Sequence, residues 1–294
     1  MAKVGFLFTI GLLLMSLTVL SLALFIAEVE KGSNEKVTEL VRYDRLHDLD
    51  TSINEAFREI FKVSSGISII YTNKTNNTFF IKENLPNGNS TIFAQNMTAF
   101  EKFLNKTSNS PTDNVTLYLA NLANVHANLP LVITPYNITY THFPSFGSNT
   151  IIVSPKQFNF YGYNITITTP INPSTTLQTF KFVSGTDMIV KIKIIGPTQN
   201  RIINQRVSSS GLSYLQVRDS GGTINLFNIS FNNSKLWIDK QAGVAKIDVS
   251  TGIMMRGDQI ELLRIWYPRK LYNVTLPQSK VKTSSNVMIE SLQV

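Results

Sequence analysis

Eleven asparagines stand in the pattern Asn-x-Ser/Thr, whose side-chain amide is the acceptor for N-linked glycans in surface and secreted proteins. Random placement of the 28 Asn among the 55 Ser and Thr would give about five such sites. No site precedes residue 73, and the excess predicts a glycosylated surface outside the cytoplasm. The eleven residues are Asn73, Asn76, Asn89, Asn96, Asn105, Asn114, Asn137, Asn164, Asn228, Asn232 and Asn273.

Residues suited to catalysis are few in this chain. It contains no Cys, and its three histidines, His47, His126 and His142, are far apart in the sequence. Asp219 and Asp239 could bind Ca²⁺ weakly, although neither belongs to a dense acidic loop. The sequence contains no Gly-x-Ser-x-Gly, no His-Glu-x-x-His and no Gly-rich phosphate loop. We therefore expect neither an enzyme nor a bound metal or cofactor.

Charge is distributed unevenly along the chain. The 27 Lys and Arg exceed the 19 Asp and Glu by eight. Residues 1–63 hold seven basic and nine acidic residues (−2), whereas residues 64–294 hold twenty and ten (+10). A cationic outer part favours anionic surfaces or acidic glycans as partners. Because no block of five or six like charges occurs, we do not expect nucleic-acid binding.

The segment Val4–Ala27 carries no charge and consists mostly of large apolar residues. Its 24 residues would span about 36 Å as a helix, enough to cross a hydrocarbon core of about 30 Å. Lys3 precedes the segment and Glu28 follows it, which predicts a membrane-spanning helix with its N-terminus in the cytoplasm and its C-terminus outside. A cleaved signal peptide is the alternative, since Ser21 and Ala23 are small residues at suitable positions for a cut.

Small residues within this segment predict helix association. Gly5, Thr9 and Ser16 lie close to one helical face, and Gly11 and Thr18 mark another. Small residues at such spacings let the backbones of two helices approach closely. We therefore predict that the helix binds further copies of itself.

A second helix is expected to follow as a stalk. Gly32, Ser33 and Asn34 predict a break in the first helix, and the stalk should run over residues 35–62 and end at residues 64–66. An amphipathic stripe supports it, formed by Leu46, Leu49, Ile53, Phe57 and Ile60 at spacings of three or four.

Beyond residue 66, short runs of alternating apolar and polar residues predict β-strands separated by Gly, Pro and Asn turns. We expect three parts: residues 1–63 with the apolar helix and stalk, residues 64–170 with mixed β-structure, and residues 171–294 forming a β-sandwich. Helical inserts are expected at residues 99–105 and 117–127. Residues 131–141 are expected to form one strand. The fold class is α+β, a long N-terminal helix and stalk followed by a mainly antiparallel β-sandwich.

The layout of residues 1–63 resembles that of type IV pilin-like subunits, archaeal ones in particular. In that family an uncharged N-terminal helix continues into an amphipathic helix and a β-rich globular part. The resemblance implies a structural subunit of a surface filament, in which apolar helices form the core and glycosylated β-rich parts form the sheath. The membrane would hold the subunit before assembly, and attachment would be the filament's role.

A lone anchored protein is the alternative hypothesis. In that case the β-rich part would act as an adhesin or glycan-binding ectodomain. Its sugar-binding aromatic residues would come from Tyr161, Tyr163, Trp237, Trp266 and Tyr267.

Overall fold

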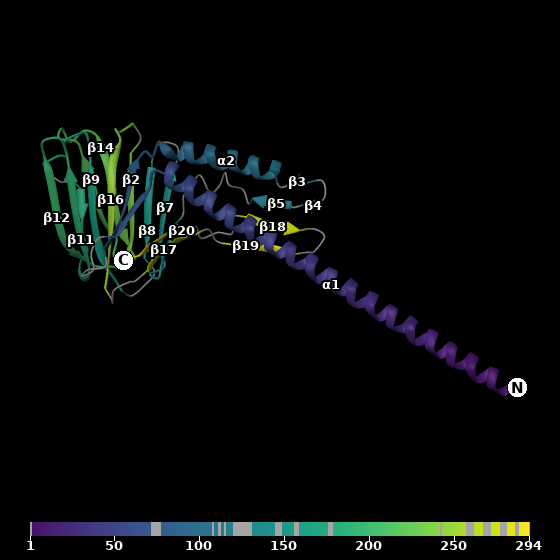
Figure 1. Ribbon diagram of the computed structural model, residues 1–294. Coiled ribbons are helices and arrows are strands. Elements are labelled where there is room, and N and C mark those ends of the chain that lie inside the picture. Colours follow the sequence, from purple (N-terminus) through teal and green to yellow (C-terminus); the bar gives the residue numbers. More distant parts are fainter. Residues whose placement is uncertain are drawn as a thin grey trace. The chain divides into compact units, whose positions relative to one another are not determined.

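The computed structural model describes residues 2–71, 78–107, 109–110, 113–114, 116–119, 131–144, 149–155, 159–175, 179–241, 243–256, 262–266, 272–276, 281–285 and 288–293. The chain divides into two compact units, an N-terminal unit (Met1–Ser52) and a β-rich unit (Ile53–Val294). Figure 1 labels the helices and strands.

Helix α1 is one continuous helix of 63 residues, Ala2–Ser64. The predicted break at residues 32–34 is therefore wrong. A Gly within a helix costs only about 1 kcal/mol relative to Ala, which a long cooperative helix tolerates. Around the expected break, the Thr38 hydroxyl donates a 2.8 Å hydrogen bond to the Asn34 carbonyl, one helical turn earlier.

The predicted C-terminal end of the helix is confirmed. The Ser65 N–H donates a 3.0 Å hydrogen bond to the Phe61 carbonyl. Gly66 then adopts a left-handed conformation with φ +71°, which stops the helix. The Ser65 hydroxyl accepts a 3.1 Å hydrogen bond from the Ile67 N–H and so starts the chain into the first strand.

Helix α2 (Asn89–Thr107) contains the predicted helical insert at residues 99–105 but begins ten residues earlier. The Asn87 side-chain oxygen accepts a 3.0 Å hydrogen bond from the Asn89 N–H, which satisfies one of the free donors at the helix start. The second predicted insert, residues 117–127, is wrong where the structure describes it. Residues 117–119 belong to strand β5 (Thr116–Leu119), and residues 120–127 lie outside the described residues.

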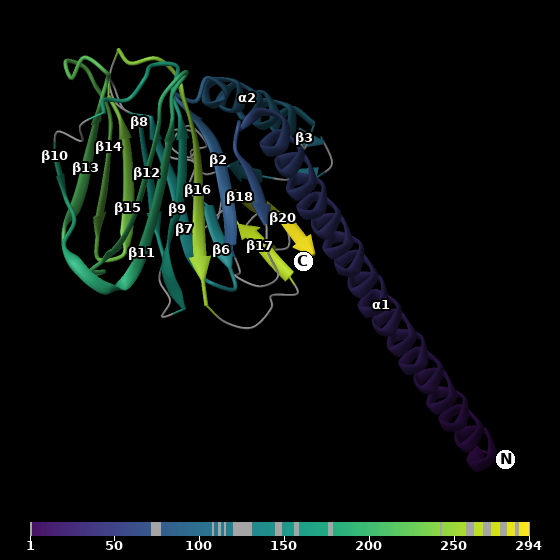
Figure 2. The same ribbon diagram turned by 90° about the vertical axis from the view of Figure 1, so that its left-hand side faces the viewer.

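Six strands form the first sheet (Figure 2). Their order is β1 (Ser68–Tyr71), β2 (Thr78–Leu85), β16 (Ile247–Met255), β9 (Phe160–Thr168), β11 (Ser184–Ile195) and β12 (Asn200–Val207). The pairing of β9 with β11 is parallel and the other neighbours are antiparallel.

Nine antiparallel strands form the second sheet. Their order is β10 (Thr179–Lys181), β13 (Ser213–Arg218), β14 (Asn225–Asn232), β15 (Lys235–Lys240), β8 (Asn149–Ser154), β7 (Ile138–Pro144), β6 (Leu131–Thr134), β17 (Leu262–Trp266) and β20 (Met288–Gln293). Two small sheets complete the described strands: β19 (Val281–Ser285), β18 (Tyr272–Leu276) and β5, and the pair β3 (Asn109–Ser110) and β4 (Asp113–Asn114).

The two large sheets lie face to face in a sandwich-like arrangement (Figures 1 and 2). Tyr163 of β9 packs against Phe231 of β14 with ring centroids 5.7 Å apart. Phe79 of β2 stacks on Tyr136, in the turn between β6 and β7, at 6.0 Å. Alternate residues of the strands point into this core and their neighbours point outward. The expected α+β class is confirmed at this level: a long N-terminal helix followed by two mainly antiparallel sheets.

Residues 131–141 do not form the single strand that alternation predicts. They make a hairpin of β6 and β7 around Pro135, Tyr136 and Asn137, and Asn137 adopts φ 49°. Asn tolerates this left-handed conformation better than most residues because its short side chain can bond locally. Each large sheet also takes strands from both sides of residue 170.

Candidate assembly surface

Large apolar side chains cover the described N-terminal part of α1 and are exposed to solvent. Nine of them lie between residues 15 and 29, and each is at least 54% exposed. Isolated exposed apolar residues are common on proteins, but contiguous exposed apolar surface of this extent is unusual on a soluble monomer. These residues surround the helix on all sides, and we call the group the apolar helix face: Met15, Leu17, Val19, Leu20, Leu22, Leu24, Phe25, Ile26 and Val29.

Within the part of the chain that the structure describes, no helix is long and apolar enough to cross a membrane. The predicted span begins at Val4, and residues 4–14 lie outside the residues whose side chains are described.

A narrow strip that contains two small residues, Ser16 and Ala23, runs along the apolar helix face. Met15, Ser16, Val19, Leu20 and Ala23 line a shallow apolar depression. Ser16 and Ala23 are seven residues apart and therefore lie almost directly above one another on the helix. Ala23 was not among the predicted assembly residues, although its seven-residue spacing from Ser16 could have indicated it.

The other predicted assembly residues are only partly described. Thr18 is exposed, and its hydroxyl donates a 2.8 Å hydrogen bond to the Met15 carbonyl. Gly5, Thr9 and Gly11 belong to α1, but their side chains lie outside the described residues.

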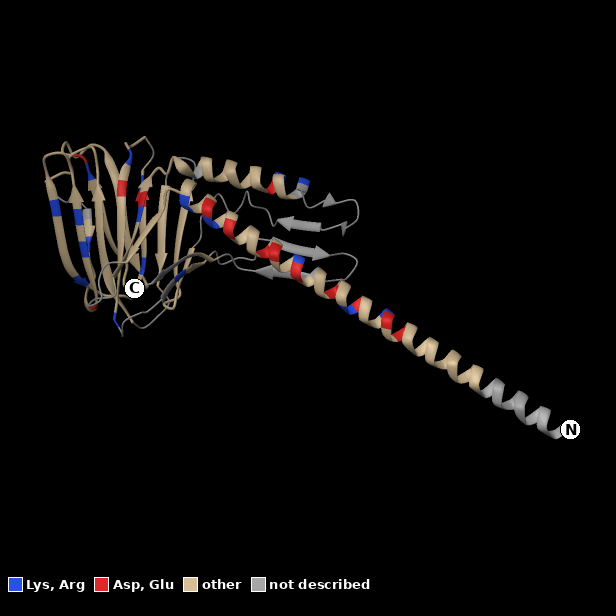
Figure 3. Cartoon of the chain, viewed as in Figure 1, with Lys and Arg blue, Asp and Glu red and all other residues tan. Residues whose placement is uncertain are grey.

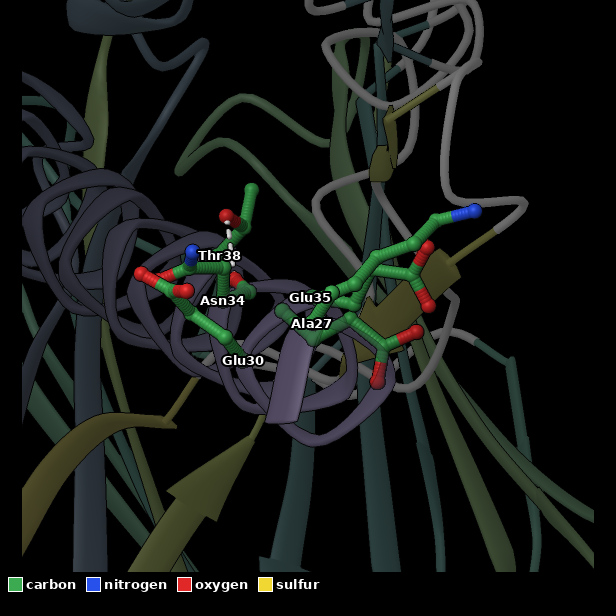
Figure 4. Close-up of a pocket in the computed structure, with 7 residues that line it drawn as sticks. Ala27, Glu30, Asn34, Glu35 and Thr38 are labelled. Atoms are coloured by element: carbon green, nitrogen blue, oxygen red, sulfur yellow. Dashed lines mark hydrogen bonds between the residues drawn. The ribbon is translucent and has the colours of Figure 1, made fainter. Parts of the chain in front are cut away.

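A polar stretch of α1 follows the apolar helix face, and Figure 4 shows Glu30, Asn34, Glu35 and Thr38 in it. Glu30, Glu35 and Glu39 extend from successive turns around a shallow depression that Asn34 and Thr38 also line. Figure 3 shows that acidic residues alternate with basic ones along this part of α1. The helix therefore has an apolar first part and a charged second part, as the sequence predicted.

The last turns of α1 belong to the β-rich unit and are anchored by aromatic packing. Phe93 of α2 is fully buried and meets Phe57 and Phe61 edge-on, at centroid distances of 6.3 and 6.0 Å. Edge-to-face geometry of this kind is favourable because the positive ring edge meets the negative face. Phe61 takes the core position that the predicted stripe assigned to Ile60, which is half-exposed.

A buried polar cluster lies where α1 ends, between the two sheets. Glu83 of β2 is 3% exposed and accepts hydrogen bonds through both carboxylate oxygens. Oε2 accepts from the Tyr140 hydroxyl at 2.5 Å, and Oε1 accepts from the Asn87 amide at 3.1 Å. Nδ1 of His142 also contacts Oε1, and this nitrogen must donate because a carboxylate has no proton to give.

Asn87 connects this cluster to the end of α1. Its amide nitrogen donates to the Ser65 carbonyl at 2.7 Å as well as to Glu83. The cluster therefore joins α1, β2, β7 and the start of α2. Glu83, Asn87, Tyr140 and His142 are all buried, and we interpret the cluster as structural.

Two buried tyrosines have strongly perturbed acidities. Burial raises the pKa of Tyr140 well above its usual value, and the negative charge of Glu83 together with its hydrogen bond raises the pKa further. Burial alone raises the pKa of Tyr163, whose hydroxyl donates a 2.6 Å hydrogen bond to the Ser234 carbonyl. Because its side chain is fully buried, Tyr163 cannot be one of the sugar-binding aromatic residues suggested by the sequence.

The six sequon asparagines with described side chains all lie at the surface. Asn89, Asn96 and Asn137 are exposed, and Asn164, Asn228 and Asn232 are half-exposed. The side chains of Asn73, Asn76, Asn105, Asn114 and Asn273 lie outside the described residues.

Both carboxylates for which the sequence suggested weak Ca²⁺ binding, Asp219 and Asp239, accept hydrogen bonds from groups of the protein. Asp219 accepts from the Ile224 N–H at 2.8 Å and the Thr223 hydroxyl at 3.2 Å, and these hydrogen bonds lower its pKa. Asp239 accepts from the Thr150 hydroxyl at 2.9 Å and the Gln241 amide at 3.0 Å. Among the described residues, no group of three or more potential ligands could hold a metal ion.

No protein-family model, curated protein or solved structure matches this chain.

Proposed function

We propose that this chain is a structural subunit of a pilin-like extracellular filament that assembles through its N-terminal helix. The observation that carries the proposal is the apolar helix face, whose nine large side chains are exposed in the single chain. Packing of these helices against further copies would form the filament core, and the β-sandwich part would form the outer sheath.

Helix packing of this kind has a clear driving force. Burying a large apolar side chain fully contributes about 1.5–3 kcal/mol. Because each of the nine is at least half exposed, burial between copies would contribute on the order of 10 kcal/mol per subunit. This is comparable with the cost of association, about 4–15 kcal/mol. The strip containing Ser16 and Ala23 would let a neighbouring helix approach closely.

Opposite charges support contact between copies. Residues 1–63 carry −2 (seven basic and nine acidic residues), and residues 64–294 carry +10 (twenty and ten). The charged part of α1 in one copy therefore complements the β-rich part of another.

An extracytoplasmic location accompanies this proposal. The sequons with described side chains are all at the surface, where glycans fit. The apolar N-terminal helix would hold the subunit in the membrane before assembly, with the N-terminus inside and the C-terminus outside.

The second candidate function is a monomeric membrane-anchored adhesin or glycan-binding ectodomain. A group of cations on the outer face of the six-stranded sheet favours it. Lys191 and Lys193 of β11, Arg206 of β12 and Lys82 of β2 are exposed there, and Figure 3 shows the basic residues on these strands. Such a surface suits an anionic surface or an acidic glycan.

The test compares two matched substitutions in α1. Ser16→Leu places a large side chain on the narrow strip, whereas Ser21→Leu makes the same change about 140° away around the helix. Both changes raise hydrophobicity equally and should preserve membrane retention. Filaments sheared from the cells are then counted by electron microscopy with immunogold labelling of this protein.

The filament proposal expects labelled filaments in the parent, a reduction of at least about tenfold for Ser16→Leu, and little change for Ser21→Leu. Equal filament numbers for both variants would show that the strip has no role in assembly. A parent protein that stays in membranes while sheared filaments carry no label would favour the anchored adhesin instead.

A further inference from the structure

The outer face of the six-stranded sheet contains one row of residues with an unusual composition. Strand register places Phe80 of β2 beside Gly252 of β16, Gly252 beside Asn164 of β9, and Asn164 beside Lys191 of β11. Asn164 begins the sequon Asn-Ile-Thr, and Thr166 points outward from the same strand. The row therefore brings an aromatic ring, a glycine and a glycan acceptor together.

The ring of Phe80 lies across Gly252. A Cβ atom at residue 252 would lie 2.6 Å from Cε1 and 2.9 Å from Cδ1 of that ring, closer than any side chain could approach. Gly252 is accordingly buried although it faces outward, and Phe80 remains half-exposed. Neighbouring strands are about 4.8 Å apart, so the ring extends to within about one strand spacing of Asn164.

The amide of Asn164 is accessible for modification. Its side chain is half-exposed and has no hydrogen-bond partner in the part of the chain that the structure describes. Lys191 flanks it on one side, and on the other side lies Gly252, over which the Phe80 ring extends.

We propose that Asn164 carries an N-linked glycan whose first sugar packs against the exposed face of the Phe80 ring. A pyranose ring presents an apolar face of C–H groups, which suits the large apolar and electron-rich face of a phenyl ring. The Phe80 ring covers the backbone at Gly252, so the sugar would lie on the outward face of the ring beside Asn164. The proposal rests on the extracytoplasmic location proposed above but not on polymerisation.

Further sugars of the same glycan have polar partners nearby. A groove of about 610 Å³ next to the row is lined by Lys82, Thr166, Thr168, Asp248 and Ser250, among others. Hydroxyl, ammonium and carboxylate groups are the donors and acceptors that saccharide hydroxyls require.

Another sequon in the chain lacks this arrangement and provides a control. Asn228 of β14, in Asn-Ile-Ser, is also half-exposed on a central strand. Its neighbours in register are Gln216 and Asp239, so neither residue directly beside it is aromatic. Its side-chain oxygen already accepts a 3.1 Å hydrogen bond from the Asn225 amide.

The experiment uses protein purified from the cells that produce it. Mass spectrometry of proteolytic peptides determines whether Asn164 carries a glycan. Thermal unfolding is then measured for the parent, Asn164→Gln, Phe80→Leu and the double variant, with Asn228→Gln as the control in both backgrounds. Phe80→Tyr is included because it keeps the ring if Phe80→Leu does not fold.

We expect a glycan on Asn164 and a fall in Tm of about 2–4 °C for Asn164→Gln. The fall should persist with Phe80→Tyr and shrink below about 1 °C with Phe80→Leu. Asn228→Gln should have the same effect in every background.

An unmodified Asn164 in protein glycosylated elsewhere would overturn the proposal and leave the filament proposal intact. An equal fall in Tm with and without the ring would overturn it as well. If no sequon were modified, the proposed location would lose its support together with this inference.

Discussion

Replacement of Glu83 by Gln should destabilise the β-rich unit by about 2–4 kcal/mol. Glu83 accepts hydrogen bonds from Tyr140, Asn87 and His142 in a site that is 3% exposed. A glutamine oxygen can still accept from Asn87 and His142, and the Tyr140 hydroxyl can rotate to accept from the glutamine amide. Three hydrogen bonds to a charged group thereby become neutral, with a loss of roughly 0.5–1.5 kcal/mol each.

Two further variants set the scale for this prediction. Glu83→Ala leaves all three donors without an acceptor and should cost more, about 4–5 kcal/mol. Glu101→Gln makes the matched change at a half-exposed position in α2 and should alter stability by no more than about 0.5 kcal/mol.

The measurement is the free energy of unfolding from guanidinium titrations at pH 7, followed by a signal of the β-sheets. Slopes of the titrations must agree among variants for the comparison to hold. If Glu83→Gln stays within about 0.5 kcal/mol of the parent, the carboxylate charge does not stabilise the cluster and the reasoning is refuted.

The raised pKa values of Tyr140 and Tyr163 predict a loss of stability in alkali. Above about pH 10 the unfolded chain releases these protons while the folded chain retains them, so the free energy of unfolding falls as pH rises. Unfolding titrations from pH 8 to 11 should show a shallower fall of this free energy with pH for Tyr140→Phe than for the parent. An unchanged dependence on pH would contradict the assignment to Tyr140. Gly66→Ala should cost about 1–3 kcal/mol, because residue 66 has φ +71° and a Cβ there would lie 2.8 Å from the Asn87 side-chain oxygen. Gly32→Ala has open space around its Cβ within α1 and should stabilise the helix by up to about 1 kcal/mol, so circular dichroism melts of the two variants should shift in opposite directions.

Local sequence patterns were sufficient for several features of this protein. The uncharged segment from residue 4 and the three- and four-residue spacing near residue 53 predict helix, and α1 covers both. Alternation in Asn164–Thr168 predicts a strand, and β9 contains it. These patterns succeed because helix and strand periodicities depend on neighbouring residues. Gly66 also ended the helix as expected, since the left-handed conformation is a local property of glycine.

Long-range contacts decided the remainder. The continuity of α1 through Gly32 depends on the cooperativity of the whole helix rather than on the local propensity of three residues. Ser65 and His142 are distant in sequence from Glu83 and Asn87, and only the pairing of the two sheets with the helix end brings them into one buried cluster.

The row of Phe80, Gly252 and Asn164 shows the same division most clearly. The sequence by itself determined that Asn164 begins a sequon within a run of alternating apolar and polar residues, because both depend on adjacent residues. Only the tertiary structure decided that a phenyl ring lies beside it, since strand order and register join residues that are more than eighty positions apart. Register of this kind depends on the packing of complete sheets, which no short segment specifies.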